Sequence, residues 1–214
     1  MGIARLALSA TPFAGRPPAI ARAYLDALIV AALIALFLIT FVIRTFYIPS
    51  VSMVPTLQVR DVLLVDEIAY RLHRPAQGDI AVFTPPVNSR GNDYVKRVIG
   101  VPGDAIAISN GIVYHNGTAL REPYENQPPN YDLAIRRYEI YVGGRPLDPR
   151  TADVPPRALW QAPNRIPNGF YFVLGDNRNY SDDSHVWGFV PERGFLGRAF
   201  LILWPLDRLR VLER

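Results

Sequence analysis

The feature that most constrains this chain is a long apolar run near its N-terminus. Residues 27–43 carry no charge, and Thr40 is the one polar side chain among them. Extending the run back to Tyr24 brings it close to the roughly 20 residues that cross a bilayer as a helix, although it then includes Asp26. We therefore predict one N-terminal transmembrane helix over residues 24–43.

Two other interpretations of the run stay open, a helix buried in a core and a cleavable signal peptide. A signal peptide ends at a site of small residues, and no such site follows this run. Its orientation follows from the preference of flanking cations for the cytoplasm. Arginines 5, 16 and 22 precede the run, whereas Arg44 alone follows it closely. We therefore expect residues 1–23 in the cytoplasm and residues 45–214 on the outer side of the membrane.

The remainder of the chain has the pattern of β structure. Short segments rich in Val and Ile, bounded by turn residues, predict strands, and they lie at residues 61–68, 79–84, 93–99, 105–108, 112–114, 170–174 and 198–204. Asn110-Gly111 predicts a tight hairpin turn, and Asn116-Gly117 marks the next turn. No long helical periodicity follows residue 44, and 20 prolines argue against a helical bundle. We predict a mainly β, antiparallel domain behind the N-terminal helix.

Residues 121–168 differ from the rest in composition. Nine of the prolines lie there, which indicates an irregular insert between two parts of the β core. A disordered linker is the alternative. The segment also holds Tyr124, Tyr131, Tyr138, Tyr141 and Trp160, which makes it more aromatic than a typical linker.

The composition excludes several kinds of chemistry. The sequence has no cysteine, so disulfides, thiolate metal sites and a cysteine nucleophile are excluded. It contains no P-loop, no GxSxG elbow and no cluster of metal-ligand residues. A net charge of +4 permits contact with anionic lipid or nucleic acid without requiring either.

The segment Pro49–Leu57, PSVSMVPTL, contains a candidate nucleophile in Ser52. A serine hydroxyl needs a base to remove its proton, and an arbitrary Ser-x-Ser is more often a simple turn. One candidate base is a histidine, with Asp183 or Asp176 completing a triad. The histidines are His73, His115 and His185.

The other candidate base is Lys96. Burial would have to lower its pKa from near 10.4 to about 7–8, which costs on the order of 4 kcal/mol. In a strand, Tyr94, Lys96 and Val98 share one face, so the lysine would have apolar or aromatic neighbours. The alternative is a lysine on a solvated strand face, where most lysines lie.

Four segments resemble, in the same order, the sequence boxes of type I signal peptidases. They are Pro49–Leu57, Gly78–Phe83, Tyr94–Asp104 (YVKRVIGVPGD) and Gly175–Pro191 (GDNRNYSDDSHVWGFVP). The resemblance implies a serine endopeptidase that removes N-terminal signal peptides from exported preproteins, cutting after small residues in an Ala-x-Ala-like pattern. It further implies a single-pass protein of the inner (plasma) membrane whose catalytic domain faces the periplasm. Its expected partners are signal peptides, the lipid bilayer and the secretion machinery, with no nucleic acid, metal or cofactor.

The resemblance also implies roles for particular residues. Ser52 matches the nucleophile and Lys96 the general base, while the Ser50 hydroxyl and the Ser52 N–H match an oxyanion hole. Three residues match positions that support this dyad: Ser181 orients the lysine, Gly175 leaves room beside it, and Asp183 holds the last box together. The walls of the substrate pocket match Phe46, Ile48, Tyr94 and Val95.

The last box departs from its common form, GDNRDNSxDSRxWG. Here Asn179 replaces an aspartate, Tyr180 an asparagine and His185 an arginine. A protonated His185 can pair with Asp183, though without the permanent charge of arginine. This leaves open a pH-sensitive network, and a plain surface histidine is the alternative.

Three further interpretations of the whole chain stay open. Self-cleaving proteins of the SOS-repressor type share a Ser/Lys dyad, but they carry a DNA-binding domain where this chain has its apolar run. Specialised peptidases of conjugation or secretion systems are closer. An anchored β domain that binds partners without catalysis is the third, and the presence of both Ser52 and Lys96 argues against it.

Overall fold

The computed structural model describes residues 19–41, 43–86, 91–148 and 155–214. The chain divides into two compact units, one up to Phe41 and the other from residue 42 onward, here called the β unit. The first unit contains one described helix, α1 (Ala19–Phe41). Within the described ranges, no helix combines the length and the apolar character that a membrane crossing demands.

Helix α1 differs in its limits from the helix predicted over residues 24–43. It begins at Ala19 and ends at Phe41. Ile43 instead opens strand β1 (Ile43–Tyr47) and lies opposite Asp66 of the neighbouring strand. The backbone of Ile43 is therefore paired within a sheet, which hydropathy alone does not reveal because Ile43 is the last residue of the apolar run.

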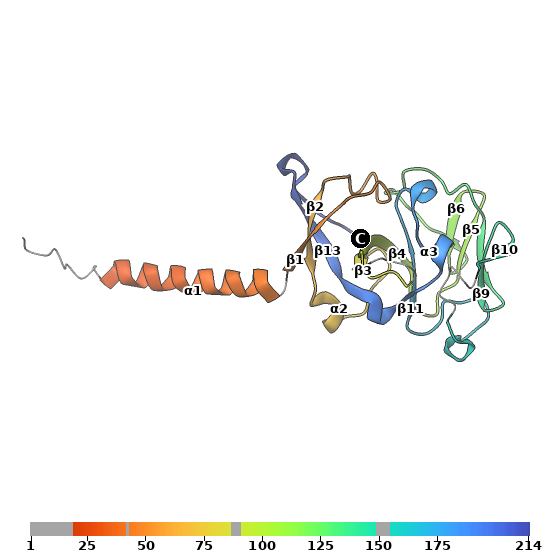
Figure 1. Ribbon diagram of the computed structural model, residues 1–214, viewed down its shortest axis with the longest axis horizontal. Helices are drawn as coiled ribbons and strands as arrows, with labels where there is room; N and C mark the ends of the chain where they lie inside the picture. The colour runs from red at the N-terminus through yellow and green to blue at the C-terminus, as the bar shows by residue number, and fades with distance from the viewer. Residues whose placement is uncertain (1–18, 42, 87–90, 149–154) are drawn as a thin grey trace, which may run out of the picture. The chain divides into compact units, whose positions relative to one another are not determined.

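The larger of two sheets in the β unit has eight strands, and all its pairings are antiparallel. Its path runs β1, β2 (Val62–Asp66), β13 (Phe195–Trp204), β3 (Ile80–Phe83), β4 (Tyr94–Gly100), β11 (Phe170–Leu174) and β12 (Val190–Pro191), and β14 (Arg210–Val211) pairs with β13. Strand β13 is the longest and curls through the sheet from β2 to β3 (Figure 1).

The second sheet has six strands and forms the opposite end of the β unit (Figure 1). Its order is β10 (Arg145–Pro146), β9 (Glu139–Val142), β8 (Leu133–Arg136), β5 (Ile106–Ser109), β6 (Ile112–His115) and β7 (Thr118–Ala119). The turns Asn110-Gly111 and Asn116-Gly117 join three of these strands, and all four residues have positive φ angles between 50° and 84°. Tight hairpin turns require such angles, so both predicted turns are confirmed.

Short helices complete the β unit. They are α2 (Ala69–Leu72), α3 (Ser184–Trp187) and the 3₁₀ turns η1 (Arg157–Leu159), η2 (Arg178–Tyr180), η3 (Glu192–Gly194) and η4 (Leu206–Arg208). The absence of long helices from the described part of the β unit agrees with the mainly β, antiparallel prediction.

The predicted strands correspond to β2, β3, β4, β5, β6, β11 and β13. Strands β8, β9 and β10 lie within residues 121–168, where the sequence predicts an irregular insert, and residues 149–154 of that insert lie outside the described part. The turn between β8 and β9 is formed by Arg137 and Tyr138, with φ angles of 55° and 69°. Arginine and tyrosine are rarely found at positive φ, because their side chains are strained there. The sequence therefore does not predict this hairpin.

Three buried apolar clusters hold the two sheets. The cluster under β2, β3 and β13 includes Met53 and Leu57, which come from the serine-bearing segment. Burying two large side chains on either side of a loop stabilises it by about 1.5–3 kcal/mol each. The loop that carries Ser52 is therefore part of the core and has a defined conformation.

Candidate active site

The loop between β1 and β2 positions Ser52. At its base, Ile48 N–H donates to Asp61 O at 2.9 Å, and Arg60 N–H donates to Ile48 O at 2.8 Å. Met53 and Leu57 anchor the loop to the core from within. Ser52 is 7% exposed, so its hydroxyl meets the outside only at the floor of a cleft.

Lys96 lies in β4, where its backbone pairs with Ala81 of β3. Its side chain is 4% exposed, and its Nζ is hydrogen-bonded to Ser52 Oγ at 2.6 Å. Burial disfavours the ammonium form and lowers the pKa of Lys96 to about 8, although three carboxylates, those of Asp183, Asp182 and Asp176, act in the opposite direction. The lysine can therefore hold a neutral, proton-accepting amine at mildly alkaline pH.

Ser50 lies on the open side of the dyad. Its Oγ is 3.3 Å from Ser52 Oγ, and the side chain is exposed to the cleft. No hydrogen bond in the described part of the chain uses the Ser52 N–H. Two donors are thus available beside the nucleophile, which is what stabilisation of a developing oxyanion needs.

Gly175 permits a close approach that no other residue would allow. A Cβ on Gly175 would lie 2.2 Å from Ser181 Oγ and 2.4 Å from the Ser52 carbonyl oxygen. The room it leaves is thus filled by these two serines. The hydrogen bond predicted from Ser181 to Lys96 is not made. Ser181 Oγ is buried without a hydrogen-bond partner, and Lys96 Nζ bonds to Ser52 Oγ.

The last box binds the serine loop directly. Asn177 N–H donates to Ser52 O at 3.0 Å, and Asn177 Nδ2 donates to Val51 O at 3.1 Å. Asp183 is fully buried and accepts from Gly175 N–H at 2.9 Å, and its other oxygen lies 2.7 Å from His185 Nδ1. The predicted contact between Asp183 and His185 is therefore present in the structure.

The geometry separates the two candidate bases. His185 Nδ1 faces Asp183, and no hydrogen bond among the described residues joins Ser52 Oγ to a histidine. His73 lies at the end of α2 and His115 pairs with Asp104 at 2.8 Å. Lys96 alone, within the described part, contacts Ser52 Oγ with a group able to accept its proton.

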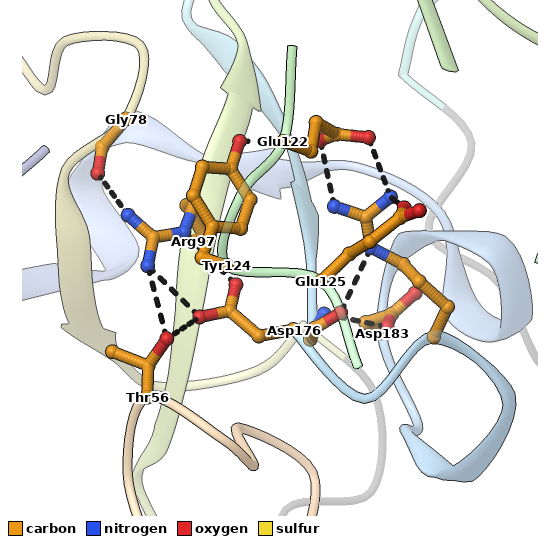
Figure 2. A network of polar contacts seen from close by, with 10 residues as sticks. Thr56, Gly78, Arg97, Glu122, Tyr124, Glu125, Asp176 and Asp183 are labelled. Atoms are coloured by element: carbon orange, nitrogen blue, oxygen red, sulfur yellow. Dashed lines mark hydrogen bonds and ion pairs between the residues drawn. The ribbon is translucent and has the colours of Figure 1, made fainter. Parts of the chain in front are cut away.

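A buried ion pair behind the dyad was not predicted from the sequence. Arg97 donates to both oxygens of Asp176, at 2.9 and 2.8 Å, and the two side chains are 2% and 0% exposed. Figure 2 shows Arg97 also bonded to Gly78 O, with Thr56 on the same carboxylate and the Tyr124 ring 3.7 Å from the guanidinium. Arg97 and Asp176 both lie inside the matched boxes, but only tertiary contact reveals their pairing, since 79 residues separate them.

The dyad opens into a cleft of about 810 Å³. All four predicted pocket residues line it, together with the three site residues on its floor: Phe46, Ile48, Tyr94, Val95, Ser50, Ser52 and Lys96. Residues of the last box also line it, including Asn179, Tyr180, Asp182 and His185. No group of three or more metal-ligating side chains occurs in the described ranges.

The site and the curled sheet around it define a peptidase. A family model described as signal peptidase, peptidase S26, matches residues 21–204. The chain belongs to this family, because the match extends over most of its length.

Relatives from several bacteria agree. The chain is 39% identical to a probable signal peptidase I-2 of Synechocystis sp., over 86% of this chain and 74% of the relative. It is 33% identical to signal peptidase IB of Staphylococcus aureus, over 85% and 89%. A solved signal peptidase I from Enterococcus faecalis is 29% identical and covers 59% of this chain and 97% of its own, with a TM-score of 0.39, which is too low to carry an argument about the fold.

Proposed function

We propose that this protein removes N-terminal signal peptides from exported preproteins, with Ser52 as nucleophile and Lys96 as general base. The observation that carries the assignment is the 2.6 Å contact between Lys96 Nζ and Ser52 Oγ, made by a lysine whose burial lowers its pKa to about 8. Membership of the signal peptidase family supplies the substrate class.

The first half of the reaction forms an acyl-enzyme. The neutral amine of Lys96 takes the proton of Ser52 Oγ as that oxygen attacks the scissile carbonyl carbon. The oxyanion that forms accepts hydrogen bonds from the Ser52 N–H and the Ser50 hydroxyl. When the peptide C–N bond breaks, the Lys96 ammonium returns its proton to the departing amine, which becomes the new N-terminus of the mature protein.

The second half releases the signal peptide. Lys96, neutral again, takes a proton from a water molecule that attacks the ester carbonyl, and the collapse of the intermediate returns a proton to Ser52 Oγ. Ser181 supports this cycle in our proposal, because its buried hydroxyl has no partner and lies beside Ser52. It can accept an N–H from Lys96 in the ammonium state, when the lysine needs additional acceptors.

The cleft is suited to an extended peptide with small apolar side chains. Phe46, Ile48, Tyr94 and Val95 supply apolar walls close to the nucleophile. Backbone hydrogen bonds to a strand edge would hold such a peptide. We propose that shallow pockets at these walls select alanine or similar residues at the first and third positions before the cut.

We further propose that the apolar run over residues 24–43 holds the enzyme at the inner (plasma) membrane, with residues 1–23 in the cytoplasm and the catalytic domain on the periplasmic side. The support is the uncharged sequence of residues 27–43 and the arginines that precede it. Extraction of membranes at alkaline pH tests this, because an anchored chain stays in the pellet. Release into the supernatant would contradict it. Contact with the secretion machinery is part of the same proposal.

The test of the activity is cleavage of a preprotein in detergent by the wild type and by Ser52→Ala and Lys96→Ala. We expect cleavage by the wild type and a loss of at least about 10³-fold in each variant. Undiminished cleavage by either variant would overturn the dyad. His185→Ala is the matched control for a histidine base, since it would abolish cleavage only if the histidine removed the serine proton.

A further inference from the structure

One segment outside the matched boxes lies along the last box for most of its length. Residues 122–131, here called the strap, connect β7 to β8 and contain no strand of their own. They run beside residues 175–185, here called the catalytic loop. Asn126 N–H donates to Asp176 O at 2.9 Å, so the two segments are joined through their backbones as well as through side chains.

The first end of the strap is fastened by buried charges. Glu122 accepts two hydrogen bonds from Arg178, at 2.6 and 2.8 Å, and the two side chains are 4% and 0% exposed. Arg178 Nε in turn donates to Gly175 O at 3.1 Å. Figure 2 shows the Tyr124 ring against the Arg97 guanidinium, with the Tyr124 hydroxyl donating to Glu122. Buried bidentate pairs of this kind are well ordered in geometry.

Asn179 binds the second half of the strap. Its Oδ1 accepts from Asn130 N–H at 2.9 Å, and its Nδ2 donates to Pro128 O at 3.0 Å. An ionised aspartate could not make both bonds, because a carboxylate has no hydrogen to donate. Asn179 replaces the aspartate that is common at this position of the last box. Its amide therefore makes two hydrogen bonds to the strap, one as acceptor and one as donor.

Tyr131 fastens the far end. Its ring stacks on the imidazole of His185, with centroids 4.3 Å apart and planes 12° apart. His185 Nδ1 lies 2.7 Å from Asp183, whose other oxygen binds Gly175 N–H. The histidine that replaces arginine at position 185 therefore also fits the strap. The face of its ring stacks on Tyr131, and Nδ1 at the edge of the ring contacts Asp183.

We propose that the strap positions the catalytic loop for peptide cleavage, with Asn179 and Tyr131 as positioning residues. The catalytic loop in turn holds the nucleophile, because Asn177 binds the carbonyls of Ser52 and Val51. Displacing a nucleophile by about 1 Å can lower a rate by about 10²-fold. The inference rests on the proposed function. Tyr131 is not among the residues that line the cleft, and in our proposal it acts on the catalytic loop through its stack on His185.

The decisive variant is Tyr131→Leu, with Tyr131→Phe as the matched control. Leucine removes the stack on His185, whereas phenylalanine keeps the ring and removes a hydroxyl that has no hydrogen-bond partner. We expect Tyr131→Leu to lower kcat about tenfold with KM within twofold, and Tyr131→Phe to keep wild-type kcat. Ile140→Ala, buried in the second sheet, controls for general loss of stability and should leave kcat unchanged.

Two further variants test the path. If Tyr131 acts through His185, the double variant Tyr131→Leu with His185→Ala should have the kcat of His185→Ala alone. If the double variant instead loses kcat by the product of the two single losses, Tyr131 does not act through His185. Asn179→Asp removes the donor to Pro128 O and should lower kcat by about tenfold, although it restores the residue more common in the last box. An Asn179→Asp enzyme with wild-type kcat would contradict the role of Asn179.

Amide hydrogen exchange decides the proposal without reference to activity. In Tyr131→Leu we expect faster exchange at Gly175 and Asn177, whose N–H groups bind Asp183 and Ser52 O, and unchanged exchange in β2, whose core cluster does not include Tyr131. Unchanged exchange at both amides, or equal acceleration everywhere as in Ile140→Ala, would overturn it. A wild type that leaves preproteins uncut would refute the proposed function alone, since the exchange result still decides whether the strap holds the loop.

Discussion

Lys96 Nζ lies 2.6 Å from Ser52 Oγ although 44 residues separate the two side chains. The lysine comes from a central strand of the larger sheet and the serine from a loop at its edge. Bringing them together beneath a cleft removes water from the amine, which lowers its pKa, and places the amine at hydrogen-bonding distance from the hydroxyl that it deprotonates in the proposed mechanism. One packing arrangement therefore supplies both the geometry and the basicity.

The pH dependence of cleavage follows from that pKa. Lys96 accepts a proton only when neutral, and its pKa is lowered to about 8. We therefore expect kcat/KM to rise about tenfold per pH unit below pH 8 and to level off above it. Initial rates of preprotein cleavage between pH 6 and 10 measure this. A profile that levels off near pH 6.5 would point to a histidine base instead.

The same burial makes Lys96 destabilising at neutral pH. Its pKa falls from 10.5 in water to about 8 in the fold, so the unfolded chain binds the proton more tightly. The destabilisation is complete below pH 8 and disappears as pH rises toward 10.5, and it is on the order of 3 kcal/mol. We expect the inactive Lys96→Met to resist urea better than the wild type at pH 7, with the difference shrinking by pH 10. A less stable Lys96→Met at pH 7 would contradict this.

Ser50 is expected to act on the transition state and not on binding of the peptide. Its Oγ is close enough to Ser52 Oγ, at 3.3 Å, to reach an oxyanion formed there. We expect Ser50→Ala to lower kcat by about 10²-fold with little change in KM. Ser50→Thr keeps a hydroxyl and should recover most of the rate. Equal activity of the alanine and threonine variants would argue against the role.

Substitution of Gly175, which directly follows β11, tests the close approach of Ser181 and Ser52 to this glycine. In Gly175→Ala the new Cβ would overlap Ser181 Oγ and the Ser52 carbonyl oxygen, so the serine loop must move. We expect at least a 10²-fold loss of cleavage and a loss of about 1–3 kcal/mol in the free energy of unfolding. Gly194→Ala is the control, because its Cβ would meet no heavy atom nearer than 3.2 Å. Similar losses in both variants would contradict the explanation.

Breaking the buried ion pair of Arg97 and Asp176 should lower the free energy of unfolding far more than breaking an ion pair on the surface. Asp176→Asn keeps the shape but leaves the Arg97 charge buried without its counter-charge, and we expect a loss of about 3–5 kcal/mol in the free energy of unfolding. Arg74→Ala breaks the exposed pair with Glu192 and should cost less than about 1 kcal/mol. Urea unfolding of the two variants measures the contrast, and equal costs would contradict it.

The sequence predicts this fold well where local rules apply and poorly where they do not. The Asn-Gly turns at 110 and 116 have the positive φ angles expected of them, because only a few residue types tolerate that conformation. The sequence does not predict the hairpin of β8 and β9, because its turn is formed by Arg137 and Tyr138, residue types that rarely adopt positive φ angles. Tyr138 is held there by packing edge-on against Trp160, a tertiary contact that overrides the local cost.

The site shows the same division. Burial of Lys96 was a requirement deduced from chemistry, whereas the ion pair of Arg97 with Asp176 could not be deduced, because no local pattern tells which buried carboxylate faces which arginine. The hydrogen bond expected between Ser181 and Lys96 is missing. Whether a hydroxyl and an amine form a hydrogen bond depends on the orientation of both side chains in the folded protein. The spacing of residues along the chain does not define that orientation.

The sequence by itself therefore determined the β character of the domain, its tight turns, the residue types able to do the chemistry and the order of the four boxes. Tertiary structure alone decided that Lys96 loses its water and meets Ser52, and that Gly175 is crowded by two serines. It also decided that Asn179 and His185 find partners in a proline-rich segment more than 45 residues away. The physical reason is that desolvation and hydrogen bonding depend on distances of a few ångströms in space, which form only when distant segments pack together.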